Sequence, residues 1–378
     1  VHEATRRVTV AAWTGRAGPT AEAGAGEPGG PGGAEGTAGP AGPAGAEIRT
    51  SRRAVGLAVA VGVLLLALLL SLMIGSNLLA PGEVLHQLLS PDGTGNTSVI
   101  RGHRVPRTVL GAVVGAALGV AGALMQSLTR NPLGDPGVLG INAGAGLAVV
   151  LAVAVTGRTG IGFYLWFGFL GAGLAAVAVY TLGSVGRAEA TPARLAIAGV
   201  AISAAIAALI QTVILTDQQV FNEFRLWAAG SLEGRGWPIL RIVAPVVALG
   251  IVGAALLTPS LNALALGDDA GTALGVRVRR TRTLTMAAVA VLCGAATAAV
   301  GPIAFVGLGV PHLARAVVGP DQRWVLPYAV PLGAAMLLVA DVIGRVLVPE
   351  EIQVGIVTAL LGGPVLIALV RRPRLKLL

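Results

Sequence analysis

Side chains that could perform covalent chemistry or bind a metal are few and scattered in this 378-residue sequence. Cys293 is the only cysteine, which excludes an intrachain disulfide and a cysteine-based zinc or iron–sulfur site. The only lysine is Lys376, near the end of the sequence, whereas a phosphate-binding loop needs a lysine after its glycines. His312 has no second histidine or acid at a spacing suited to a metal. We therefore expect no catalysis, metal or cofactor in this chain, and any ATP to be hydrolysed by another subunit.

Acids within apolar segments are the usual mark of ion-coupled transport, and only Asp341 lies well inside one. Their scarcity disfavours a proton- or sodium-coupled carrier, which stays as an alternative. The remaining polar residues of the apolar segments are costly in hydrocarbon, so we expect them to face a bundle interior or a pathway. They are Gln126, Asn142, Gln211, Thr212, Thr297 and His312.

Long apolar segments must position these side chains. Hydrophobic residues make up 54% of the chain and charged residues 12%, and the mean hydropathy is +0.80. A bilayer core takes about 20 apolar residues per helical span, and continuous runs favour helices over the alternating segments of a barrel. The sequence therefore predicts an all-α, polytopic membrane protein. Its candidate spans are 54–78, 108–128, 137–156, 161–183, 193–215, 237–257, 284–300, 302–319, 326–347 and 353–370.

The N-terminal segment differs from the rest of the chain. Residues 17–46 are mainly Gly, Pro and Ala, with a few acids and no aromatic residue. Such a composition buries too little surface to offset chain entropy. We expect residues 1–52 to be a disordered cytoplasmic tail and residues 53–378 to be the transmembrane domain. The tail is too polar for a signal peptide, so the first span is expected to direct insertion.

Arginine positions predict the orientation. Arg52 and Arg53 precede the first span and a basic cluster follows the last one, so the positive-inside rule places both termini in the cytoplasm. Because the arginines lie beside spans, nucleic-acid binding receives almost no weight. A surplus of arginines on the outer side needs its own explanation: Arg101, Arg104, Arg107, Arg158, Arg225, Arg235 and Arg345.

A polar stretch at residues 261–282 joins spans six and seven on the predicted cytoplasmic side. It is typical of a helical hairpin with a turn at Gly267, a second helix that Asp268 and Asp269 open at its positive dipole end, and a stop at Gly275. An ordinary positive-inside loop is the alternative. Apolar side chains on a solvent-side hairpin call for a partner protein. They are Leu261, Leu264, Leu266 and Leu274.

Three glycines recur at every fourth position of the second span, namely Gly111, Gly115 and Gly119. They line one helix face and let a neighbouring backbone approach closely. The neighbour is either another helix of the same bundle, the commoner case, or a second subunit.

Six stretches in one order resemble the permease family of the ABC importers for iron–siderophores, haem and cobalamin. The resemblance runs from about residue 55 to the C-terminus, and it implies a type II importer permease with ten spans. It also implies two permeases around a central pathway, two ATPase subunits and an extracytoplasmic binding protein. The second permease would be either a copy of this chain or a relative. The stretches are RVPRT (104–108), GALMQSLTRNPLGDPGVLGINAGA (122–145), LALGDDAGTALGV (264–276), GPIAFVGLGVPHLAR (301–315), LLVADVIGR (337–345) and EIQVGIVTALLGGPVLIALV (351–370).

The resemblance further implies two partner sites. In the family the loop between spans six and seven couples to the ATPase. Here it would contain Leu266, Gly267, Asp268, Asp269, Leu274 and Gly275. Arginines at the outer ends of spans two and nine receive glutamates of the binding protein. Here these are Arg104, Arg107 and Arg345, which would explain the outer surplus. Anchoring of the helix end at lipid headgroups is the alternative for Arg104 and Arg107.

The family's cytoplasmic gate corresponds to Asn131 and Leu133, in a loop that Pro132 and Pro136 stiffen by fixing φ. A second gate position, before span five, is small and hydroxylated in relatives. This sequence departs from that pattern with Pro192 and Ala193, which leaves the second gate open.

The resemblance predicts a permease subunit that works by alternating access in a bacterial cytoplasmic membrane. The breadth of the siderophore branch favours a ferric siderophore as cargo. The alternatives are a haem or cobalamin importer permease of the same family, an ion-coupled secondary transporter, and a membrane scaffold with no pathway.

Overall fold

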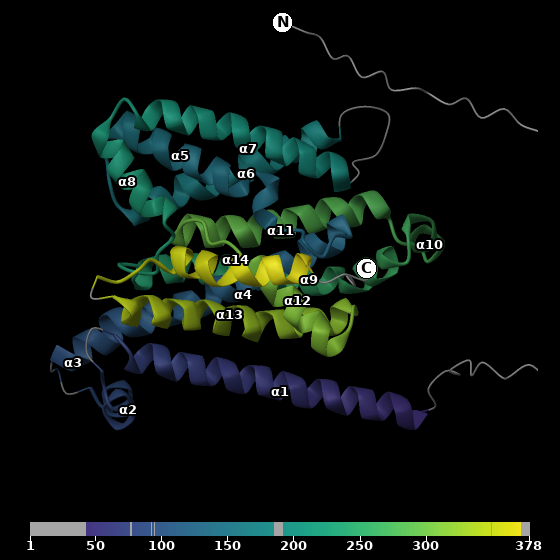
Figure 1. Cartoon of the computed structure of the whole chain (residues 1–378), viewed down its shortest axis with the longest axis horizontal. Coiled ribbons are helices and arrows are strands. Elements are labelled where there is room, and N and C mark those ends of the chain that lie inside the picture. Colours follow the sequence, from purple (N-terminus) through teal and green to yellow (C-terminus); the bar gives the residue numbers. More distant parts are fainter. Residues whose placement is uncertain are drawn as a thin grey trace, which may run out of the picture. The chain divides into compact units, whose positions relative to one another are not determined.

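The computed structural model describes residues 43–75, 78–91, 93, 95–184, 192–348 and 350–371. Every regular element in these ranges is a helix, as the sequence predicts (Figure 1). The helices are α1 (Pro43–Met73), α2 (Pro81–Leu89), α3 (Gly95–Thr97), η1 (Ser98–Arg104), α4 (Val105–Thr129), η2 (Pro136–Leu139), α5 (Ile141–Thr156), α6 (Ile161–Gly183), α7 (Pro192–Ile214), α8 (Gln218–Ala228), α9 (Trp237–Ala265), α10 (Asp268–Ala273), α11 (Val278–Val300), α12 (Val306–Val318), α13 (Gln322–Leu347) and α14 (Val354–Val370).

Each predicted apolar segment coincides with a helix. Seven helices of the described ranges are long and apolar enough to cross a membrane, and three further apolar helices, within α5, α12 and α14, are shorter. The first helix begins at Pro43, so residues 43–52, which the sequence assigned to the tail, belong to α1. Residues 1–42, which make up the rest of the predicted tail, lie outside the described residues.

The buried helix α4 packs against α13, α11, α12 and α9. Its glycines face α13 in the same chain. A Cβ added to Gly115 would lie 2.3 Å from the carbonyl oxygen of Gly333, and one added to Gly119 would lie 2.6 Å from that of Ala329. A Cβ on Gly111 would lie 3.0 Å from the Leu338 side chain. The glycine face therefore packs inside this bundle, and α13 occupies the place that a second subunit would need.

α2 and α3 lie at one end of the bundle and α10 lies at the other (Figure 1), and polar contacts gather near the start of α4 and directly after its end. The first region, called the η1 end, contains α2, α3, η1 and the C-terminal ends of α1 and α13. The second region, called the α10 end, contains α10 and the loop that follows α4. Arg104 and Arg107 lie at the η1 end and Asp268 lies at the α10 end, so the fold separates the two predicted partner sites.

Candidate functional sites at the two ends of the bundle

All three arginines of the predicted docking site meet at the η1 end. Arg104 Nη1 donates to the carbonyl oxygens of Leu72 and Met73 at 2.9 and 2.8 Å. Arg345 Nη1 donates to two further carbonyls at the end of α1, at 2.8 and 3.0 Å. The last turn of a helix has unpaired acceptors and the negative end of the dipole, which both cations satisfy. Arg104 and Arg345 are buried, and they cap α1.

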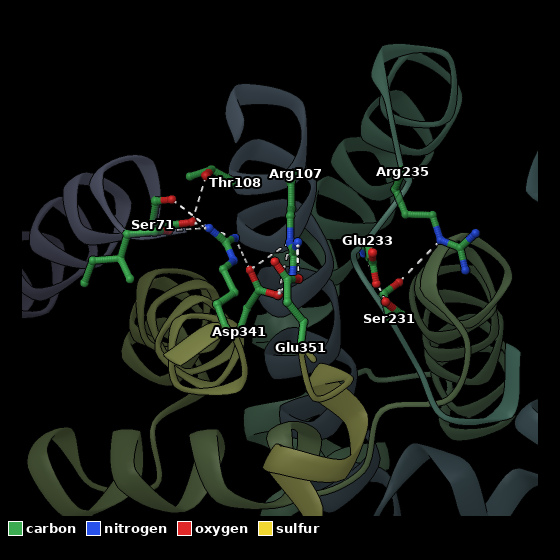
Figure 2. Close-up of polar contacts among 10 residues, drawn as sticks. Ser71, Arg107, Thr108, Ser231, Glu233, Arg235, Asp341 and Glu351 are labelled. Carbon is green, nitrogen blue, oxygen red and sulfur yellow. Dashed lines mark hydrogen bonds and ion pairs between the residues drawn. The ribbon is translucent and has the colours of Figure 1, made fainter. Parts of the chain in front are cut away.

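Arg107 is held by two carboxylates from distant parts of the chain (Figure 2). Its Nη2 lies 2.9 Å from Asp341 Oδ1, and its Nη1 lies 2.8 Å from Glu351 Oε2. Asp341 also accepts a hydrogen bond from Arg345, and its side chain is 2% exposed. The single acid that the sequence places well within a span is thus neutralised by two arginines. Such pairing opposes a role for Asp341 as an ion-coupling site.

These arginines border a cavity of about 410 Å³ whose other wall includes Glu233 and Arg235 (Figure 2). Arg235 Nε donates to the carbonyl oxygen of Ser231 at 3.3 Å. Burial lowers the pKa of Arg235 to about 10, so the guanidinium stays protonated at neutral pH. Guanidinium groups bind carboxylates through charge-assisted hydrogen bonds, and a cavity bordered by several of them suits an acidic side chain.

The hairpin predicted at residues 261–282 is present at the α10 end. Gly267 has a φ of 116° and Gly275 a φ of 83°, which are conformations that favour glycine, and α10 lies between them. Leu266 is 70% exposed and Leu274 is 64% exposed. The other two leucines of the stretch were wrongly expected on its surface, since Leu261 and Leu264 are buried. They lie on the last turns of α9, which continues into the bundle.

Asp268, the first residue of α10, is bound by two arginines. Its Oδ1 accepts from Arg130, which follows α4, and its Oδ2 lies 2.7 Å from Arg282 of α11. Asp269 lies beside it in the first turn. The sequence does not indicate that Arg130 and Arg282 pair with Asp268. Arg130 precedes it by 138 residues, and nothing in a single sequence connects positions so far apart.

Three of the four predicted gate residues share one cavity of about 420 Å³. Asn131, Leu133 and Ala193 line it, together with residues of α4 and η2. Asn131 Oδ1 accepts from the Leu133 backbone N–H at 2.9 Å, which fixes the turn after α4. The side chain of Pro192 lies outside the described residues. In the same loop, burial raises the pKa of Asp135, whose Oδ1 accepts from the Gly137 N–H.

Polar residues of the apolar helices divide into two groups. Gln126 is buried and donates to the carbonyl oxygen of Leu308, and Thr297 donates to Asn142 Oδ1 at 2.8 Å, as expected for residues that face the interior. Gln211 and Thr212 are exposed on α7 of the single chain, so they do not face the bundle interior, and a pathway is the position that the expectation leaves for them. The Thr212 hydroxyl donates to the carbonyl oxygen of Ala208 in its own helix, so its exposure leaves no donor unpaired.

Apolar helices with polar cavities at both ends of one buried helix define a polytopic membrane protein of the transport class. The chain belongs to the FecCD transport family, whose family model matches residues 63–372. The resemblance drawn from the six stretches of sequence is confirmed.

Individual relatives agree with this assignment. The chain is 46% identical over 323 residues to the ferric enterobactin transport system permease protein FepD of Escherichia coli (strain K12), a match that covers 84% of this chain and 97% of that protein. It is 40% identical over 277 residues to the hemin transport system permease protein HmuU of Yersinia pestis, covering 72% and 82% of the two chains. A solved structure, "An inward-facing conformation of a putative metal-chelate type ABC transporter", is similar with a TM-score of 0.73 and 26% identity, and covers 83% of this chain and 98% of that one.

Proposed function

We propose that this chain is the permease subunit of an ATP-driven importer in the cytoplasmic membrane of a bacterium, with a ferric siderophore as its cargo. The similarity to the ferric enterobactin permease, over nearly all of that protein's length, supports the cargo class. One observation carries the importer proposal, which is that the buried helix α4 connects two sites. The cavity bordered by Arg104, Arg107 and Arg345 lies at its start, and the gate cavity and α10 lie at its end. Alternating access needs such a connection between opposite ends.

The η1 end is the proposed docking site of an extracytoplasmic binding protein. Arg107, with Arg104 and Arg345 beside it, would receive carboxylates of that protein at the cavity. Since Arg104 and Arg345 also cap α1, an acid bound there would touch a rigid platform. Charges of this kind set the register and the association rate of a complex more than its affinity, and their effect weakens with salt.

The α10 end is the proposed docking site of the ATPase. Leu266 and Leu274 are large apolar side chains on an exposed hairpin, and burial under a partner would remove them from water. Gly267, Asp268, Asp269 and Gly275 give the hairpin its shape. Two ATPase subunits and a second permease, either a copy or a relative, complete the proposed assembly. In this orientation the α10 end and both termini face the cytoplasm.

In the proposed cycle, the loaded binding protein docks at the η1 end and ATP closes the ATPase dimer. Closure moves α10, and the loop with Asn131 and Leu133 changes between two positions in the cavity that Ala193 also lines. Pro192 and Ala193 would form the second gate position.

A paired substitution tests the ATPase site. Leu274→Ser should abolish co-purification with the ATPase subunit and ATP-dependent uptake, while membrane insertion is unchanged. Leu215→Ser is the matched control. Leu215 is 81% exposed and follows the C-terminal end of α7, whereas Ala193 of the gate cavity lies at the N-terminal end of that helix. Equal retention of the ATPase by both variants would remove the coupling assignment.

Two further measurements separate the alternatives. Uptake that collapses with an ionophore while ATP is maintained would indicate an ion-coupled secondary transporter. A membrane scaffold should tolerate substitution of Asn131 and Leu133, whereas a gate should leak or jam.

A haem importer permease is the second candidate function. The similarity to the hemin permease of Yersinia pestis favours it, at lower identity and lower coverage than the ferric enterobactin permease. Competition of the two cargoes for uptake by the reconstituted complex distinguishes the candidates.

A further inference from the structure

Arg130 has an unusual backbone and two bonds that cross the α10 hairpin. It ends α4 in the left-handed conformation, with φ 49° and ψ 34°. Among the described residues other than glycine, only Phe305 shares a positive φ. From this position the Arg130 Nη2 donates to the carbonyl oxygen of Leu264 at 2.7 Å and to Asp268 Oδ1 at 2.5 Å. One guanidinium therefore holds both sides of the Gly267 turn.

The residues on either side of Arg130 belong to the gate cavity. Thr129 and Asn131 both line it, and the Asn131 N–H donates to the carbonyl oxygen of Gln126 at 3.2 Å. Arg130 is thus the residue at which the gate loop leaves α4 and is also bound to α10. A displacement of α10 must either pull the gate loop or break the bond to Asp268, because the bond to Leu264 joins Arg130 to the end of α9.

We propose that Arg130 is the positioning residue that transmits movement of α10 to the gate loop. This inference rests on the importer function proposed above. The inference assigns a role to Arg130, which belongs neither to the predicted hairpin nor to the predicted gate residues. The transmitting link is a bond between side chains and not only the shared packing of the helices.

Arg282 supplies a matched control for this link. It binds the second oxygen of the same carboxylate, Asp268 Oδ2, at 2.7 Å, but from α11, the helix that follows α10 in the chain. Loss of Arg282 removes one charge and one bond to Asp268 and leaves the gate loop attached. Loss of Arg130 removes one charge, the bond to Asp268 and the bond to Leu264, and so breaks the side-chain link between the gate loop and α10.

The link adds little to the stability of the fold. The Arg130 side chain is 38% exposed and that of Asp268 is 40% exposed, and ion pairs so open to water contribute little to folding. Arg130→Gln should therefore insert and assemble normally, and its effect should appear in the response of the gate to nucleotide.

A cysteine reporter measures that response without requiring that the cargo be known. Cys293, the only cysteine of the chain, is buried, and Cys293→Ser gives a cysteine-free background. Ala196 of α7 lines the gate cavity, and Ala196→Cys places a single thiol there. The rate of its labelling by a maleimide is compared without nucleotide and with trapped ATP, in the complex with the ATPase subunit.

In the parent background, trapped ATP should change the labelling rate by at least about fivefold, the lower end of usual coupling between sites. Arg130→Gln should keep ATP hydrolysis but lose most of that change, Arg130→Lys should restore part of it, and Arg282→Gln should keep it. A change as large in Arg130→Gln as in the parent would overturn the inference. A parent that binds no ATPase would overturn the proposed function itself, and with it the inference.

Discussion

At the scale of single residues, the arginines of the η1 end cap helix α1 and bind the buried carboxylate of Asp341. Arg104 and Arg345 satisfy carbonyl groups at the end of α1, where a cation also offsets the helix dipole. Arg107 and Arg345 share Asp341, which is almost fully buried. The proposed docking surface is therefore already fixed in position before a partner arrives, which would lower the ordering cost of binding.

Asp341 should be the residue on which the stability of the arginine cluster depends. Asp341→Asn leaves Arg107 and Arg345 without their shared carboxylate, and removal of one partner of a buried pair costs about 3–5 kcal/mol. Glu351→Gln should cost about 1 kcal/mol or less, because the Glu351 side chain is 29% exposed. Thermal unfolding of both variants in one detergent compares them. Equal unfolding temperatures would contradict the proposed role of Asp341.

Glu351 should compete with the binding protein for Arg107. It already occupies Arg107 Nη1 at the cavity, so Glu351→Gln should tighten docking, by up to about fivefold for a partly exposed pair worth at most about 1 kcal/mol. The gain should shrink at high salt. Glu83→Gln is the control, since it removes the same charge from α2 outside the cavity. Titration of the binding protein onto nanodiscs measures both variants, and weaker docking of Glu351→Gln would refute the competition.

The sequence indicates the arginines of the η1 end but not the residues that they bind. Arg104, Arg107 and Arg345 are visible as charges beside apolar spans, and their pattern places them correctly at one end of the bundle. Their partners are not visible, because Arg107 and Asp341 are 234 residues apart. The sequence shows Asp341 only as an isolated acid, whereas the structure shows that it binds both Arg107 and Arg345.

At the scale of helices, the close packing of α4 on α13 sets which substitutions the bundle tolerates. Gly115→Ala would place a Cβ 2.3 Å from a backbone oxygen that cannot rotate away. Overpacking of this kind costs about 1–3 kcal/mol. Gly62→Ala in α1 is the control, because its Cβ would meet nothing within 4 Å, and alanine favours a helix over glycine. The unfolding temperature should therefore be lower for Gly115→Ala than for the parent, and it should not be lower for Gly62→Ala. An unchanged unfolding temperature in Gly115→Ala would mean that α4 and α13 can move apart to accommodate the added methyl group.

Hydropathy located every apolar helix because a spanning segment needs a long uninterrupted run. It missed α2 and α8, which are short and amphipathic and lie between spans. The start of α8 had a readable signal, since Asp217 caps it by accepting from the N–H groups of Gln219 and Val220. The beginning of α1 within the Gly- and Ala-rich segment had none, because composition alone predicted a coil there.

At the scale of the whole molecule, the two ends can influence each other only through elements that reach both. α4 does so, with Arg107 near its start and Arg130 directly after its end. α13 reinforces it along much of its length and brings Asp341 and Arg345 to the η1 end. A rigid pair of helices with specific bonds at each end is a physical basis for coupling between docking and ATP binding, and it makes that coupling measurable as a free energy.

A bound non-hydrolysable ATP analogue should therefore change the affinity of the binding protein for the complex, by a factor between about 5 and 150 for typical coupling. Linkage requires the reverse effect to be equal, so the binding protein must change the affinity for a non-hydrolysable ATP analogue by the same factor. Both affinities are measured in nanodiscs at one salt concentration, because docking is electrostatic. Two unequal factors would mean that one of the titrations had not reached equilibrium. A factor of one in both directions would mean that α4 does not connect the two ends energetically.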